Sequence, residues 1–197
     1  MRFESDRPTR RRRPIEVAPF VAGTLALVAS ACGSSTPSTS PTSSTAAPRS
    51  PAAFLSAGLA AQQAGNLSVA IDDYKKVIAT APGSSTSAYA NYDLGVIAQV
   101  DQKDPASAAS EYRAALAVNP NFVDALYNLA IVLTPAQPLV AEHSYKRVIA
   151  IQPKNADAHL NLGFVYLTEG EKTQAHTEFT KAIALDLTLA KRIPAGS

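Results

Sequence analysis

The sequence predicts an all-α fold in which similar helical pairs stack on one another. The clearest pair spans residues 155–186, where two amphipathic helical patterns are joined at Glu169-Gly170-Glu171. Neither helix can bury its apolar stripe alone, so the pair needs neighbours like itself. The composition agrees, because 46% of the residues are hydrophobic, only 7% are aromatic, and there is no Trp. Much of the apolar content is Ala, which is the best helix former and lets helix axes approach closely.

The first 31 residues predict a secretory signal peptide. Arg10 to Arg13 form a basic head, and an apolar run from Val17 to Ala31 follows, with Pro19 inside it. This run is too short for a comfortable membrane span. A charged head, a short apolar middle and small residues at the end are the parts of a secretory signal.

The single cysteine, Cys32, directly follows this segment in the sequence Ala29-Ser30-Ala31-Cys32. One cysteine excludes an intrachain disulfide and a multi-cysteine zinc site. The motif resembles the lipobox of bacterial lipoprotein precursors, although that family usually has Leu where Ala29 stands. The resemblance implies that Cys32 receives a lipid and anchors the protein to the extracytoplasmic face of the cell membrane. Two alternatives stay open: Cys32 merely ends an ordinary signal peptide, or it belongs to an uncleaved anchor.

Residues 32–51 predict a tether after this cysteine, because Gly33 to Pro51 are almost entirely Ser, Thr, Pro, Ala and Gly. Such a composition offers almost no apolar surface to offset the entropy lost on ordering, so we expect disorder. With its four prolines the tether would extend roughly 3 Å per residue, about 60 Å at most. It would hold a folded domain clear of a membrane surface.

The net charge of +2 is concentrated at the N-terminus. Residues 1–31 hold six of the 18 basic residues and three of the 16 acidic ones, which leaves 12 basic and 13 acidic residues from Cys32 onward. The remainder therefore carries a formal charge of −1 and shows no basic face. We do not expect nucleic acid as a partner.

Residues 52–193 show continuous helical periodicity and predict one solenoid domain. Four successive units share an arrangement in which a small residue in the first helix precedes an aromatic residue in the second, and three units close with Pro. These units span about 52–82, 87–120, 121–153 and 155–187. The small residues are Gly58, Gly95, Ala130 and Gly163, the aromatic residues are Tyr74, Tyr112, Tyr145 and Phe179, and the closing prolines are Pro82, Pro120 and Pro153.

This arrangement resembles the tetratricopeptide repeat, whose pattern W-x2-L-G-x2-Y…A-x3-F…P has a period of about 34 residues. The resemblance covers about two thirds of the chain. The resemblance implies a right-handed α-solenoid of about four helix-turn-helix repeats. Small residues would let the helices of a pair cross closely, and the aromatic residue would fill the space between successive pairs. We also expect Asn121 and Asn155 to cap the helices after them, and Pro135 and Pro138 to shorten the helices on either side.

No catalytic constellation emerges from the sequence. It contains no nucleophile elbow, P-loop, zinc-protease or dinucleotide-binding motif, and its acidic residues are not spaced to aim two carboxylates at one bond. The three histidines, His143, His159 and His176, all fall in the last two units. A metal cluster is the alternative, but His159 occupies the place of a packing aromatic residue and the other two lie among polar neighbours. We therefore expect no enzyme activity, no cofactor and no metal.

The resemblance implies that the first helix of each pair lines a concave groove for extended peptides or helices of other proteins. Asn128 and Asn161 take equivalent places and could hydrogen-bond a peptide backbone. Val96, Ile131 and Phe164 would form an apolar ladder. Carried over to this chain, the groove candidates are Tyr89, Tyr92, Asp93, Val96, Gln99, Asp124, Tyr127, Asn128, Ile131, Asp157, Leu160, Asn161 and Phe164.

These groove positions lack the Lys and Arg with which the chaperone-binding branch of the family holds a terminal carboxylate. A mildly acidic, aromatic groove favours a neutral or basic partner. The alternative is that Tyr, Asn and Asp stand at these positions only for packing and solubility.

Together the predictions indicate a lipid-anchored binding or scaffolding module that acts on other envelope proteins or peptides of a bacterium. The alternative is a structural accessory subunit of an envelope enzyme or transporter, without a peptide groove of its own. At the C-terminus, we expect Leu185, Leu187, Leu189 and Ile193 to cover the last groove, the alternative being an apolar surface left for a partner.

Overall fold

The computed structural model describes residues 49–194 of the chain. The predicted signal peptide, Cys32 and nearly all of the predicted tether lie outside the described residues. Within them, no helix has the length and apolar character needed to cross a membrane.

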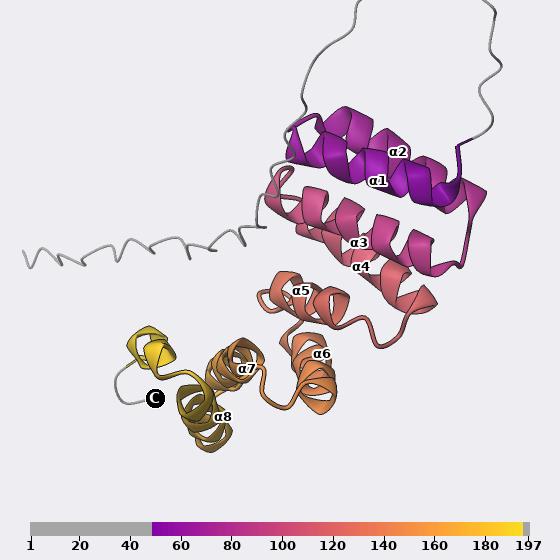
Figure 1. Ribbon diagram of the computed structural model, residues 1–197. Helices are drawn as coiled ribbons and strands as arrows, with labels where there is room; N and C mark the ends of the chain where they lie inside the picture. Colours follow the sequence, from indigo (N-terminus) through magenta and orange to yellow (C-terminus); the bar gives the residue numbers. More distant parts are fainter. Residues whose placement is uncertain (1–48, 195–197) are drawn as a thin grey trace, which may run out of the picture. The chain divides into compact units, whose positions relative to one another are not determined.

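The described residues fold into eight α-helices followed by one 3-10 helix. Consecutive α-helices pack as the pairs α1/α2, α3/α4, α5/α6 and α7/α8, and each pair contacts the next (Figure 1). The all-α fold with successive helix-turn-helix repeats is therefore confirmed. The bounds are α1 Pro51–Gln63, α2 Leu67–Thr80, α3 Ser85–Val100, α4 Pro105–Val118, α5 Val123–Leu133, α6 Pro138–Ile151, α7 Ala156–Thr168, α8 Lys172–Leu185 and η1 Leu187–Arg192.

Three of the four pairs are held close by a glycine in the first helix beneath an aromatic ring from the second. A Cβ atom added to Gly58 would lie 2.7 Å from Tyr74 Cε1. At Gly95 the distance to Tyr112 Cε1 would be 2.5 Å. Real Cβ atoms do not approach rings this closely, so glycine is required at these crossings. The ring therefore packs within its own pair, whereas the sequence suggested only a place between successive pairs.

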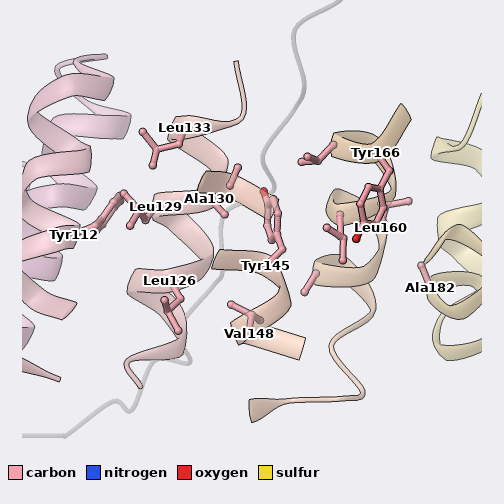
Figure 2. Packing of buried hydrophobic residues seen from close by; sticks show 14 of the residues in the cluster. Tyr112, Leu126, Leu129, Ala130, Leu133, Tyr145, Val148, Leu160, Tyr166 and Ala182 are labelled. Atoms are coloured by element: carbon pink, nitrogen blue, oxygen red, sulfur yellow. The ribbon is translucent and has the colours of Figure 1, made fainter. Parts of the chain in front are cut away.

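The aromatic rings also reach the next pair, and this second contact links the repeats. Tyr112 belongs to the same buried cluster as Leu126 and Leu129 of α5, and Tyr145 lies among residues of α5, α6 and α7 (Figure 2). Tyr74, Tyr112 and Tyr145 are among the largest fully buried side chains of the described residues. One ring thus contributes to packing within a pair and between pairs.

One of the two predicted helix caps is confirmed and the other is wrong. The side chain of Asn155 caps α7 by accepting a hydrogen bond from the backbone N–H of Ala158 at 2.9 Å. The prediction for Asn121 is wrong, because α5 begins at Val123 and its N-cap position falls on Phe122. Asn121 instead donates its backbone N–H to Asn119 Oδ1 at 3.2 Å.

The proline-containing turn of the third pair shortens one helix only. α5 has 11 residues, fewer than any other α-helix of the described part, whereas α6 has 14. Pro138 opens α6 at its first position, where a missing N–H costs nothing. Pro135 lies in the turn after α5, so only the helix before the turn is shortened.

The C-terminal helix η1 covers part of the last pair. Leu189 is buried in the core and Ile193 packs against it as a half-buried side chain. Leu187 is 78% exposed and Leu185 is 41% exposed. The expected cover therefore holds for two of the four predicted residues. Leu187 stays exposed because η1 turns only one side, that of Leu189, toward the core, and Leu185 is the exposed last residue of α8.

Candidate binding face of the first helices

The first helices of the four pairs differ in charge from the second helices. Among their residues the only Asp, Glu, Lys or Arg side chains are Asp93, Asp124 and Asp157. The second helices carry both acidic and basic side chains, and Lys75 and Arg113 are among the basic ones. We use the name first-helix face for those side chains of α1, α3, α5 and α7 that are not buried.

The predicted groove residues divide by exposure. Leu160 is fully buried, so its prediction as a groove residue is wrong; it stands in the place of Tyr92 and Tyr127 but lies in the core. Tyr89 is 52% exposed, and Asp124 and Asp157 are exposed as well. The half-buried residues are Tyr92, Asp93, Val96, Gln99, Tyr127, Asn128, Ile131, Asn161 and Phe164.

Two side-chain hydrogen bonds join successive first helices. Asn128 on α5 donates its Nδ2–H to the hydroxyl of Tyr92 on α3, with a distance of 3.3 Å. Asn161 on α7 donates in the same way to Tyr127 on α5, at 2.8 Å. Each asparagine amide is also hydrogen-bonded to a buried tyrosine, Asn128 to Tyr112 and Asn161 to Tyr145, so its N–H groups serve the protein and its carbonyl oxygen is the group left for a ligand.

An aspartate stands four residues before each of these asparagines, and this spacing places both on one helix face. Asp124 precedes Asn128, and Asp157 precedes Asn161. We call Tyr92, Asn128 and Asp124 the first triad. The second triad consists of Tyr127, Asn161 and Asp157.

Aromatic rings pack against the aromatic residues of the first-helix face. Phe122, just before α5, lies with its ring centroid 5.2 Å from that of Tyr89 and 5.0 Å from that of Tyr92. Tyr127 packs edge-on against Tyr145, and Phe164 against Phe179. Sequence reasoning missed Phe122. Phe122 directly precedes α5, but its ring packs on two tyrosines of α3, and no local sequence signal points to that contact.

Gln99 has an internal role that limits its use by a ligand. Its Oε1 accepts a hydrogen bond from the hydroxyl of buried Tyr112 at 2.6 Å. Gln62 of α1 makes the same bond to Tyr74 at 2.7 Å. A buried hydroxyl needs a hydrogen-bond partner, so the side-chain oxygen of Gln99 is already used by the hydroxyl of Tyr112.

Comparison with known proteins assigns the repeat type. The family model described as "Tetratricopeptide repeat" matches residues 94–137, and that described as "TPR repeat" matches residues 143–170. These segments are tetratricopeptide repeats.

One curated relative is the Photosystem I assembly protein Ycf3 of Acaryochloris marina (strain MBIC 11017), which is 32% identical over 80 residues. The matched stretch covers 41% of this chain and 48% of that protein, so it spans about half of the relative's length.

Among solved structures, a crystal structure of MamA is similar, with a TM-score of 0.63 and 27% identity, covering 73% of this chain and 82% of that one. MamA 41-end from Desulfovibrio magneticus RS-1 gives a TM-score of 0.60 at 21% identity, over 71% and 77% of the two chains. The latter likeness shows the fold alone.

The helical pairs differ at the first junction, between the first and second pairs. Leu55 takes the place of the tyrosine, and Asp93 takes the place of the asparagine that donates to it. Burial raises the pKa of the Asp93 carboxyl to about 6. Its charge acts on Tyr74 of α2, Tyr92 of α3 and Tyr112 of α4, whose pKa values are raised first by burial and then in part by Asp93.

Replacing Asp93 with Asn is expected to stabilise the protein at pH 7.5. The folded-state pKa of about 6 lies above the ordinary 3.8, so the ionised carboxylate lowers stability above about pH 6. That loss is relieved as the pH falls from about 6 toward 3.8. At ~1.4 kcal/mol per pKa unit, discounted for partial exposure, we expect a gain of about 1–2 kcal/mol at pH 7.5 that disappears near pH 4.

Urea unfolding at the two pH values measures this gain, with Asp101→Asn at the exposed end of α3 as the matched control. An equal effect of Asp93→Asn at pH 7.5 and pH 4 would contradict the assigned burial of the charge.

The histidines of the last two repeats have separate surroundings. His159 is buried, and its Nδ1 lies 2.6 Å from Glu178 Oε2 while its Nε2 lies 3.1 Å from the Pro153 carbonyl oxygen. It therefore ties α7 to α8 and to the preceding turn. His143 and His176 are exposed. Among residues 49–194, no group of three or more His, Cys, Asp or Glu side chains is placed to hold a metal ion.

Proposed function

We propose that this protein is a non-enzymatic scaffold that holds other proteins of the bacterial envelope on its first-helix face. One observation carries the proposal: half-buried Tyr side chains on α3 and α5 are joined to half-buried Asn side chains on α5 and α7, each of which has an exposed Asp one turn before it. Such a row offers aromatic surface together with hydrogen-bonding groups at a regular interval. Extended peptides need this combination, because their backbone amides lose water on binding and require partners.

The kinds of similar proteins support this function. Tetratricopeptide repeats match two segments of the chain, and one relative is named an assembly protein. A repeat array gives each ligand several equivalent contacts, so a moderate contribution from each repeat adds up along the face. An assembly or positioning role fits this arrangement.

Lipid anchoring at Cys32 is the second part of the proposal. The basic head, the apolar run and the small residues before Cys32 support an anchor on the extracytoplasmic face of the membrane. An anchored scaffold is confined to a thin layer near the membrane. Confinement raises its effective concentration toward membrane-bound partners without any new contact.

Partner capture by a variant of the first-helix face tests the scaffold role. We expect the combination Tyr92→Leu, Tyr127→Leu and Phe164→Leu to weaken capture at least about tenfold, because aromatic residues carry much of the energy of an interface. Leucine keeps the apolar contacts, so circular dichroism should show unchanged helicity.

The matched control changes three exposed residues of the second helices, Lys75→Ala, Arg113→Ala and Lys172→Ala, and should leave capture unchanged. Capture that survives in the first variant would reject the groove and favour an accessory subunit that binds through another surface.

Replacing Cys32 with Ala tests the anchor. We expect the variant to leave the membrane fraction, whereas the parent chain should partition with membranes and carry the added mass of a lipid. Mass spectrometry and membrane fractionation measure the two effects. A variant that still partitions fully with membranes at the mass of the parent would disprove lipidation at Cys32.

A further inference from the structure

The two triads of the first-helix face are structural copies of one another. In each, an asparagine donates to a tyrosine of the preceding repeat, and an exposed aspartate lies one helical turn before the asparagine. Burial first, and then the charge of Asp124, raise the pKa of Tyr92. Burial and the charge of Asp157 likewise raise the pKa of Tyr127 to about 12.

The second triad holds a cation supplied by the chain itself. Arg192, the last residue of η1, lies with Nη1 3.1 Å from Asp157 Oδ1. Its guanidinium is also near enough to Tyr127 to oppose the rise of that hydroxyl's pKa. Leu189 and Ile193 fix η1 on the core, so this guanidinium is presented to the triad by a packed segment. The aspartate of the second triad is thus seen paired with a guanidinium group, which lies within electrostatic reach of the tyrosine.

The first triad has the same groups and no such cation. Within residues 49–194 no Lys, Arg or His side chain forms an ion pair with Asp124. Beside it stands the aromatic pair of Phe122 and Tyr89, and Tyr89 is 52% exposed. Exposed aromatic rings attract guanidinium groups over their faces.

The groups of the first triad favour a ligand that donates hydrogen bonds. The carboxylate of Asp124 only accepts hydrogen bonds, and Asn128 still has its carbonyl oxygen available, because its amide N–H serves Tyr92. A guanidinium has five N–H donors and no acceptor. At the first triad a carboxylate or phosphate ligand would meet the negative charge of Asp124, and the four first helices contain no Lys or Arg to offset it.

We propose that Tyr92, Asn128 and Asp124 form a subsite for an arginine side chain of an extended partner peptide, with Asp124 pairing with its guanidinium as Asp157 pairs with Arg192. The inference rests on the proposed function and deepens it, because it names the chemistry of the partner. An exposed ion pair is weak by itself. The subsite therefore selects among peptides that the rest of the face already binds.

Nuclear magnetic resonance of the full chain tests the subsite with two small probes. N-acetyl-arginine-N-methylamide carries the guanidinium, and the citrulline analogue has the same shape without the charge. We expect the arginine probe to shift the side-chain amide signals of Asn128 at millimolar concentration. The citrulline probe should shift them at least about fivefold less, because it lacks the charge that Asp124 attracts.

Two substitutions locate the effect. Asp124→Asn should abolish the shift at Asn128, while Asp101→Asn outside the face should leave it intact. Arg192→Gln vacates the second triad, and the arginine probe should then also shift the side-chain amide signals of Asn161. Unchanged spectra of the core leucines show that each variant is folded.

Equal shifts from both probes, or a shift at Asn128 that persists in Asp124→Asn, would overturn the proposal. So would an unresponsive Asn161 in Arg192→Gln. These outcomes leave the scaffold role intact if the leucine variant of the first-helix face still loses its partner. If the probe results failed and the leucine variant also kept its partner, the first-helix face would be rejected as a binding surface altogether.

Discussion

Replacing Tyr145 with Ala is expected to lower the free energy of unfolding by about 4 kcal/mol, which is typical for a buried aromatic residue. Tyr145 is fully buried and its ring packs edge-on against Tyr127 at 5.8 Å. Its cluster includes residues of α5, α6 and α7, so the cavity would open between the third and fourth repeats (Figure 2). Urea unfolding measures the total loss.

Hydrogen exchange should show where the structure loosens in this variant. Repeat arrays are stabilised by contacts between neighbours, so α7 and α8 should lose protection before α1 and α2. Tyr145→Phe is the control, because it keeps the ring and should cost only about 1 kcal/mol. A uniform loss of protection in all helices would show that the repeats unfold as a single unit instead.

Replacing Gly95 with Val is expected to destabilise the protein by about 3 kcal/mol, at the upper end of the usual cost of overpacking. A Cβ atom at this position would lie 2.5 Å from Tyr112 Cε1 and 2.7 Å from Tyr112 Cδ1. The ring is fully buried and its hydroxyl is bonded to Gln99, so it has no free direction in which to move. The helices α3 and α4 would have to separate.

Ala117→Val on the exposed side of α4 is the matched control for this substitution. It adds a β-branched side chain to a helix without a clash and should cost less than about 0.7 kcal/mol. Thermal unfolding of both variants compares the two effects. If Gly95→Val lost no more stability than the control, the close contact between Gly95 and Tyr112 would be disproved.

The pairing of small residues with aromatic rings could be predicted from the sequence because it depends on local spacing. Gly58, Gly95 and Gly163 precede their aromatic partners by 16 or 17 residues, and a repeat of similar length relates the pairs. The cap at Asn155 was equally local. Asn121 failed because a helix beginning differs by one or two residues between sequence and structure, and a cap needs the correct residue.

The side-chain contacts between repeats could not be predicted from the sequence. The bond from Asn128 to Tyr92 joins residues 36 positions apart, and its geometry depends on how one pair packs on the next. Leu160 shared its position with Tyr92 and Tyr127 and therefore looked like a surface residue, but an apolar side chain without a hydroxyl turns into the core there. Arg192 also had no local signal that pointed to Asp157.

The predominance of contacts between neighbouring helices has a consequence for the order of folding. The substantial contacts join helices adjacent in sequence, with α1 and α3 the main exception. A chain of this kind does not wait for its C-terminus: α1 and α2 can close on each other while the later repeats are still being synthesised. Each new pair then finds a finished surface to pack against. The last step is the docking of η1, which places Arg192 beside Asp157 only after all four repeats have formed.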